Sequence, residues 1–146
     1  MVRRKERVSV LLDSNVLVRA LADSKGKSPS AWVWRLWLQR RIQLAVSAEV
    51  VAEYLEILDR IGVESSHAQF FERQLREGET VTRVNLGRRL RVARDPDDDM
   101  ILSTADSARV DYLVTLDKDL LELPWDERRR LKFQIVTPAE LLEMIE

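Results

Sequence analysis

The 146-residue sequence contains no cysteine, only one histidine, four glycines and four prolines. The lack of cysteine excludes disulfide scaffolds, thiol nucleophiles and thiolate metal sites, and it favours a reducing compartment. No long apolar run is present, because the run at residues 8–12 is too short for a signal peptide or a membrane span. We therefore expect a cytoplasmic protein that makes no membrane contact.

The sequence also lacks an excess of charge of one sign. Its 24 Lys and Arg residues are matched by 25 Asp and Glu residues, which gives a formal net charge of −1. A protein that binds nucleic acid through bulk charge is normally strongly basic. Any contact with nucleic acid is therefore expected to depend on local patches or on a bound cation.

The composition is 45% hydrophobic and 34% charged, which fits one globular domain over residues 1–146. Apolar runs rich in β-branched residues alternate with segments of helical spacing. Strands are expected at residues 8–12, 42–46, 80–86, 112–116 and 133–136. Helices are expected at about 29–41, 48–60 and 65–77, from Asp97 or Asp98 to 108, and from Pro138 onward, with a polar loop after the first strand. This alternation predicts an α/β fold with a mostly parallel sheet of about five strands, covered by helices on both faces.

Acidic residues follow two of these strands. Asp13 comes directly after the first strand and Asp117 after the fourth, while Asp99 lies in the first turn of the helix that leads into the fourth. Ligand sites of such sheets lie at the carboxyl ends of the strands, so these three acids are expected to converge. Glu53 lies about two turns, roughly 9 Å, along the helix after the second strand, and by itself it is better explained as a solvated helix residue than as a ligand.

Several carboxylates held together would repel one another, and a divalent cation removes that conflict. All-oxygen ligands without cysteine or a histidine cluster select Mg²⁺ or Mn²⁺. Such an ion supplies a water nucleophile and offsets charge in the transition state, which points to phosphodiester hydrolysis. The single histidine, His67, lies in a polar stretch apart from the acids and is expected at the surface.

Five segments resemble the PIN domain family, in particular the toxins of bacterial and archaeal toxin–antitoxin pairs. They are residues 12–17 (LDSNVL), 47–53 (SAEVVAE), 94–102 (RDPDDDMIL), 113–121 (LVTLDKDLL) and 136–142 (VTPAELL). The resemblance implies a three-layer α/β/α sandwich and an endoribonuclease that depends on Mg²⁺ or Mn²⁺. It also implies a set of catalytic and metal-binding residues, namely Asp13, Glu53, Asp99 and Asp117.

The same resemblance places Asn15, Ser47 and Thr115 around the metal, although Ser47 is also explained fully as a helix cap. Three consecutive aspartates, residues 97–99, stand where the family has one ligand. Counting back from Thr115 favours Asp99 over its nearest competitor, Asp98. The partners implied are RNA as substrate and an antitoxin protein that blocks the acidic pocket.

The main alternative is a PIN-fold protein-binding or assembly module with little catalytic role, which the sequence does not separate from the enzyme. Two other classes fail on single residues. A phospho-signalling receiver needs an acceptor aspartate where Ser47 follows Val46, and a haloacid-dehalogenase-type phosphatase needs a second aspartate where Asn15 stands.

Two surface features have both a functional and an ordinary interpretation. Trp32, Trp34 and Trp37 share one helix but cannot all enter one core, so an exposed ring is expected. That ring would stack on RNA, contact a partner, or be buried in a homodimer. A basic cluster either binds phosphate or forms a solvated face; it comprises Arg83, Arg88, Arg89, Arg91 and Arg94.

Overall fold

A computed structural model describes residues 7–86 and 96–145. Five strands form one sheet in which every pair is parallel, in the order β3-β2-β1-β4-β5. They are β1 (Val8–Leu12), β2 (Ile42–Ser47), β3 (Val81–Val84), β4 (Tyr112–Val114) and β5 (Gln134–Val136). Because the chain moves outward from β1 in one direction and from β4 in the other, the order reverses between these two strands. Their carboxyl ends are therefore the expected ligand edge.

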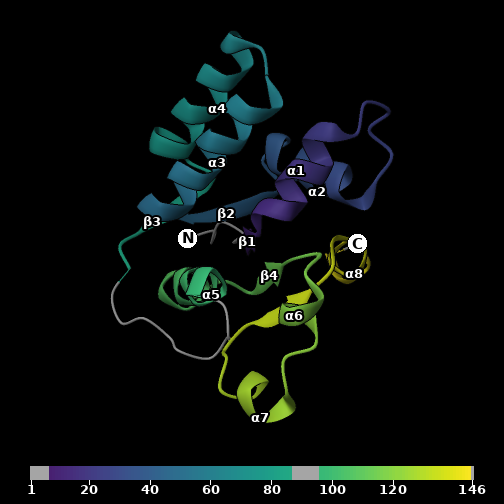
Figure 1. Cartoon of the computed structure of the whole chain (residues 1–146), viewed down its shortest axis with the longest axis vertical. Coiled ribbons are helices and arrows are strands. Elements are labelled where there is room, and N and C mark those ends of the chain that lie inside the picture. The colour runs from purple at the N-terminus through teal and green to yellow at the C-terminus, as the bar shows by residue number, and fades with distance from the viewer. Residues whose placement is uncertain (1–6, 87–95, 146) are drawn as a thin grey trace, which may run out of the picture.

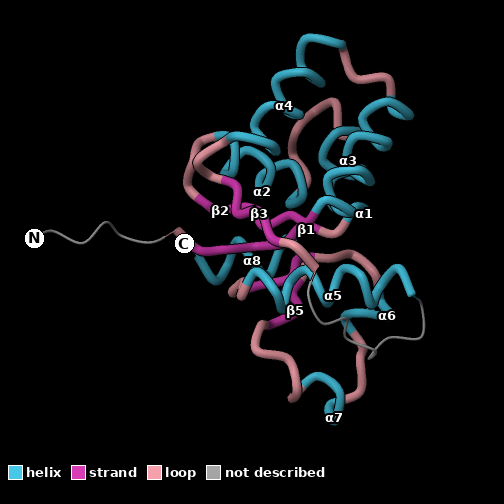
Figure 2. Tube along the Cα trace, turned by 90° about the vertical axis from the view of Figure 1, so that its left-hand side faces the viewer, coloured by secondary structure: helices cyan, strands magenta, loops and turns pink. Residues whose placement is uncertain are grey.

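Helices cover both faces of the sheet, which confirms the predicted α/β architecture (Figures 1 and 2). The first four lie on one face: α1 (Ser14–Ala22), α2 (Pro29–Leu38), α3 (Ala48–Ile61) and α4 (Ser65–Glu77). On the other face are α5 (Pro96–Ala108), α6 (Lys118–Leu121) and α7 (Trp125–Arg128). The last helix, α8 (Pro138–Ile145), packs beside α2. No helix within the described ranges is long and apolar enough to cross a membrane.

Capping residues set the starts of the helices that face the ligand edge. The Ser28 hydroxyl accepts the Ala31 N–H at 3.2 Å, and the Ser47 hydroxyl accepts the Val50 N–H at the same distance. Helix α3 ends at Gly62, whose φ of 81° lies in the left-handed region. These are the signals that single sequences carry most directly, because a cap is a local hydrogen bond.

The structure corrects several predicted boundaries. The expected polar loop after β1 is helix α1, because the Asp13 carboxylate accepts the Ser14 N–H and starts the helix at once. Helices α6 and α7 were not expected, since four residues are too few to show helical spacing. Helix α5 begins at Pro96, so Asp97 and Asp98 lie within it and do not cap it. Strand β4 ends at Val114 instead of residue 116, and β3 and β5 are also shorter than expected.

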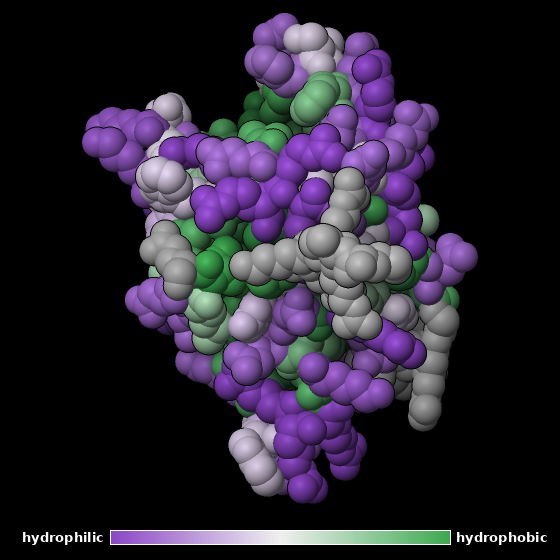
Figure 3. All heavy atoms as spheres, turned by 180° about the vertical axis from the view of Figure 1, so that it is seen from behind, coloured by the Kyte–Doolittle hydropathy of each residue, from purple (hydrophilic) through white to green (hydrophobic). Residues whose placement is uncertain are grey.

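An aromatic cluster joins α2 to α4. The ring centroids of Trp34, Trp37 and Phe71 lie 4.8–5.5 Å apart. The Trp37 indole N–H donates to the Thr80 carbonyl just before β3. As expected, one tryptophan stays outside: Trp32 is 49% exposed and lies under the Arg35 guanidinium. Seen from behind, the molecular surface is mostly hydrophilic, and hydrophobic side chains show mainly toward its middle (Figure 3).

The C-terminal cap of α3 offers a test of the local signals. A Cβ added at Gly62 would meet no atom within 4 Å, so only the left-handed backbone opposes a side chain. We expect Gly62→Ala to lower the free energy of unfolding by about 1 kcal/mol. Gly62→Asn should cost less, because asparagine tolerates this conformation. Urea unfolding of the two variants measures both; equal losses would contradict the backbone explanation.

Candidate active site

A buried carboxylate occupies the carboxyl edge of the central strand. Asp13 follows β1 directly and is 7% exposed. One of its oxygens, Oδ1, accepts the Ser14 N–H at 2.8 Å. The other, Oδ2, accepts the Thr115 hydroxyl at 2.8 Å and the Asn15 side-chain amide at 3.3 Å. Three donors therefore orient this carboxylate within the fold.

The segment after β4 is held against it. The Asp117 N–H donates to the Thr115 hydroxyl oxygen at 3.0 Å, and the Asn15 side-chain oxygen accepts the Leu116 N–H at 3.2 Å. Asp117 itself is half-buried and caps α6, because its carboxylate accepts the Asp119 N–H at 2.9 Å. Asp13 and Asp117 are thus neighbours across one small polar network.

The electrostatics of the site centre on Asp13. Burial raises the pKa of this carboxyl above its ordinary value of 3.8, and the negative charge of Asp117 raises it further. The hydrogen bonds from Thr115 and Ser14 act in the opposite direction because they favour the charged form. A buried carboxylate whose ionisation is disfavoured gains from a nearby cation, which would stabilise its charged form.

A buried tyrosine is influenced by the charges of both Asp13 and Glu53. The Tyr54 hydroxyl, on α3, donates to the Leu12 carbonyl at the end of β1. Burial raises the pKa of Tyr54 well above its ordinary value, and the charges of Asp13 and Glu53 add to the rise. Glu53 is half-buried on the same helix. The charges of Glu53 and Asp13 therefore both act on the Tyr54 hydroxyl.

Two of the four predicted acids, Asp13 and Asp117, are linked by the polar network at this edge. Within residues 7–86 and 96–145, no three Asp, Glu, His or Cys side chains lie close enough to hold one metal ion. Asp13 and Asp117 are brought together, whereas Glu53 and Asp99 are half-buried on α3 and in the first turn of α5. Asp98 is half-buried as well, so burial does not separate it from Asp99. The complete four-acid set remains a prediction.

The donor chemistry of the acid pair nevertheless fits a hard divalent cation. Mg²⁺ usually retains several waters and is held by only one or two protein carboxylates. Asp13 and Asp117 supply such a pair. Each carboxylate can accept further bonds beyond those it already makes, since its two oxygens offer about four lone-pair positions.

Sequence reasoning missed one hydroxyl beside the site. The buried Ser47 hydroxyl lies 3.0 Å from the Thr104 hydroxyl of α5. Thr104 donates to the Met100 carbonyl at 2.9 Å, so Ser47 is the donor in the pair. The pair joins the end of β2 to α5, the helix that carries Asp99. Nothing in the sequence pattern distinguishes Thr104 from an ordinary buried helix residue.

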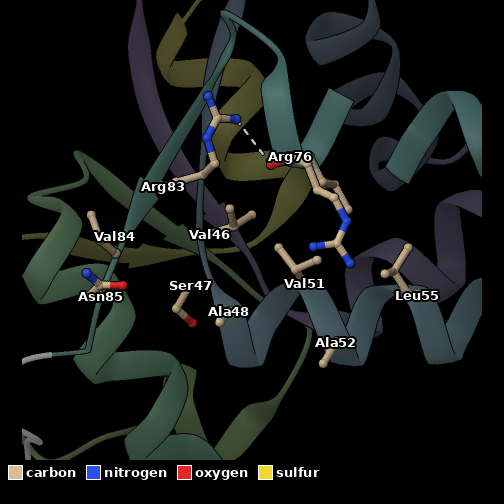
Figure 4. Close-up of a pocket in the computed structure, with 11 residues that line it drawn as sticks. Val46, Ser47, Ala48, Val51, Ala52, Leu55, Arg76, Arg83, Val84 and Asn85 are labelled. Carbon is tan, nitrogen blue, oxygen red and sulfur yellow. Dashed lines mark hydrogen bonds between the residues drawn. The ribbon is translucent and has the colours of Figure 1, made fainter. Parts of the chain in front are cut away.

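A groove of about 560 Å³ adjoins Ser47 at the ends of β2 and β3 (Figure 4). Its wall on the α3 side is apolar, and the Arg76 side chain of α4 reaches over it near Val51 (Figure 4). Arg83 is used structurally, because its guanidinium donates to the Leu75 and Gly78 carbonyls at the end of α4. The other four arginines of the predicted basic cluster lie outside the described residues. His67 is exposed, as expected.

Comparison with known proteins identifies a family and a similar fold. A family described as "PIN domain" matches residues 9–119. The crystal structure of PAE2754 from Pyrobaculum aerophilum is similar, with a TM-score of 0.52 and 20% sequence identity over 94% of this chain and 88% of that one. At that identity the likeness concerns the fold alone. No curated protein matches the sequence significantly.

The pKa of Asp13 tests the geometry of the acid pair. In metal-free protein we expect Asp117→Asn to lower the pKa of Asp13, because a neighbouring negative charge that raises it is removed. Thr115→Val should raise it, because a hydrogen bond to the charged form is lost. Asp111→Asn, at the start of β4, is the control and should change nothing. Carbon-13 NMR titration of the carboxyl measures all three.

The same shift has a consequence for stability. Because folding raises this pKa, the native state binds the proton more tightly than the unfolded state. The contribution of Asp13 to the free energy of unfolding should therefore fall as pH rises from 3.8 through the raised value. An Asp13 pKa at or below 3.8 in the metal-free protein would contradict the buried site.

Proposed function

The chain belongs to the PIN domain family, and we propose that it is an endoribonuclease that depends on Mg²⁺ or Mn²⁺. PIN domains are generally nucleases that act on RNA and typically bind a divalent metal. The observation that carries the proposal is the pairing of buried Asp13 with Asp117 at the reversal of strand order. This is where an open parallel sheet places its ligand.

In this proposal Asp13 and Asp117 anchor the metal, and Glu53 and Asp99 complete its surroundings. The metal supplies an activated water and offsets the negative charge of the transition state. Thr115 and Asn15 orient the Asp13 carboxylate by donating to Oδ2, so that its geometry does not have to be organised during the reaction. Ser47 and Thr104 hold α5 against β2.

We further propose that the protein acts in the cytoplasm as the toxin of a toxin–antitoxin pair, with an antitoxin covering the acid pair. The alternative is an assembly module with little catalytic role. The sequence and the fold are the same for both functions, so only an activity measurement separates them. The exposed Trp32 is a candidate contact for RNA, for a partner or for a second copy of the chain.

Metal-dependent cleavage of RNA distinguishes the endoribonuclease from the assembly module. We expect the protein to cut single-stranded RNA with Mg²⁺ or Mn²⁺ and to be inactive in EDTA, because the acids alone supply no nucleophile. Asp13→Asn should lower the rate by orders of magnitude and leave the fold intact. The measurement is the initial rate on labelled RNA, with circular dichroism to check folding. Cleavage that persists in EDTA would exclude the metal mechanism, and no cleavage under any condition would favour the assembly module.

Thermal unfolding tests the metal site without a substrate. We expect Asp117→Asn to raise the Tm in EDTA at pH 8–9, because it removes repulsion of Asp13. It should also reduce the further rise produced by Mg²⁺. A ligand bound only to the native state stabilises it by RT ln(1 + [L]/Kd), about 2.7 kcal/mol at a hundredfold excess over Kd.

Asparagine is the appropriate substitution because it caps helices about as well as aspartate. The cap of α6 is therefore retained in Asp117→Asn, whereas Asp117→Ala loses both the cap and the charge. If Asp117→Asn is destabilised in EDTA and its Mg²⁺ shift equals that of the parent, Asp117 is a structural cap only.

A further inference from the structure

A second cavity has a volume of about 310 Å³. Its wall includes Leu116, which separates Thr115 from Asp117, and Arg19 of α1. The rest of the wall comes from the N-termini of α2 and α8, which pack against each other. The cavity therefore opens at the same carboxyl edge of the sheet as Asp13 and Asp117.

The two helix starts have the same construction. Each has a hydroxyl cap, then a proline, then a residue that lines the cavity: Ser28-Pro29-Ser30 and Thr137-Pro138-Ala139. In each helix the cap hydroxyl accepts the N–H three residues later, from Ala31 and from Glu140. Proline has no N–H. The Ser30 and Ala139 N–H groups are thus the first amide donors, and no acceptor for either is found among the described residues.

A buried hydroxyl adds to these donors. Ser30 is only 2% exposed, yet its side chain makes no hydrogen bond with any described residue. Every fully enclosed side-chain nitrogen or oxygen in the described part of the chain has a partner. The Ser30 hydroxyl is therefore not fully enclosed, and Ser30 is one of the residues that line the cavity. A buried hydroxyl without a protein hydrogen-bond partner among the described residues is suited to bind a ligand.

A cation completes the surroundings. Arg19 is exposed and forms no ion pair with the described residues. It lies one helical turn after Asn15, which bonds both Asp13 and the Leu116 N–H. The Glu140 carboxylate in the first turn of α8 is turned back to accept the Thr137 N–H. The cavity therefore combines the Arg19 guanidinium, a hydroxyl and two helix N-termini, whose partial positive charges both favour an anion.

We propose that this cavity binds a phosphate group of the RNA next to the bond that is cleaved. The inference rests on the proposed nuclease function for the identity of the polymer. Leu116 lines the cavity and lies in sequence between Thr115, which donates to the Asp13 carboxylate, and Asp117. A phosphate in the cavity would thus hold the chain beside the acid pair. The positively charged cavity would also attract RNA, which the protein's formal net charge of −1 does not do.

Inorganic phosphate is the first probe. In amide NMR spectra of the metal-free protein, we expect phosphate to shift the Ser30 and Ala139 signals in a saturable manner. Arg19→Ala should weaken this binding several-fold and Arg19→Lys should retain most of it. Arg60→Ala is the matched control, since Arg60 also lies in the last turn of a helix, α3, away from the cavity. Signals that do not move, or equal weakening by Arg19→Ala and Arg60→Ala, would overturn the site.

Single-stranded RNA in EDTA is the second probe. The slope of log K against log salt should become shallower by about 0.7 in Arg19→Ala, the value expected for one lost phosphate contact on a single strand. Ala139→Asp should weaken RNA binding while raising the Tm, because a carboxylate suits a helix N-terminus but repels phosphate. A merely structural role for this position would not produce opposite signs.

The outcomes separate this site from the proposed activity. If Arg19-dependent RNA binding occurs without cleavage under any metal condition, the nuclease proposal fails and the phosphate site stands. If RNA is cleaved normally by Arg19→Ala at limiting substrate concentration, the phosphate site fails and the nuclease proposal stands. An acidic peptide that shifts Ser30 and Ala139, while RNA does not, would assign the cavity to a protein partner and overturn the inference.

Discussion

The Asp13 carboxylate is the interaction on which the site depends. It starts α1, accepts the Thr115 hydroxyl from the segment after β4, and lies buried at the reversal of strand order. Burying such a group costs free energy unless its charge is met by donors or by a cation. The three hydrogen-bond donors offset part of the free-energy cost of burying this charge. The pKa of Asp13 is still raised, so part of that cost is not offset. The fold thus maintains a carboxylate that favours a cation.

The polar residues of this edge serve stability and chemistry together. Asp13, Ser47 and Asp117 each cap a helix, and each is also placed where the family resemblance puts a functional group. Helix N-termini meet the carboxyl ends of strands in every β-to-α connection, so caps and ligands compete for the same positions. Substitutions that retain the cap but change the charge are therefore the informative ones.

Much of the fold could be predicted from the sequence. The five strands, the parallel arrangement and the helices α2, α3, α4, α5 and α8 follow from apolar runs, caps and spacing, which are local properties. The helices that the sequence did not predict were also missed for local reasons. Helix α1 was missed because its signal, an aspartate cap directly after a strand, is identical to that of a polar turn. Helices α6 and α7 are shorter than one period of the pattern that reveals a helix.

The sequence by itself determined that Asp13 and Asp117 follow β1 and β4, and pairing of those parallel strands then brings the two acids together. Only the tertiary structure decided that Asp13 is buried, that Thr115 and Asn15 orient it, and that Ser47 meets Thr104 across 57 residues of chain. Only it brought Arg19, Ser30 and Ala139 to one cavity. The physical reason is that position along a strand is a local property. Burial and side-chain partners depend on which helices pack over the edge, and that is settled by the whole core at once.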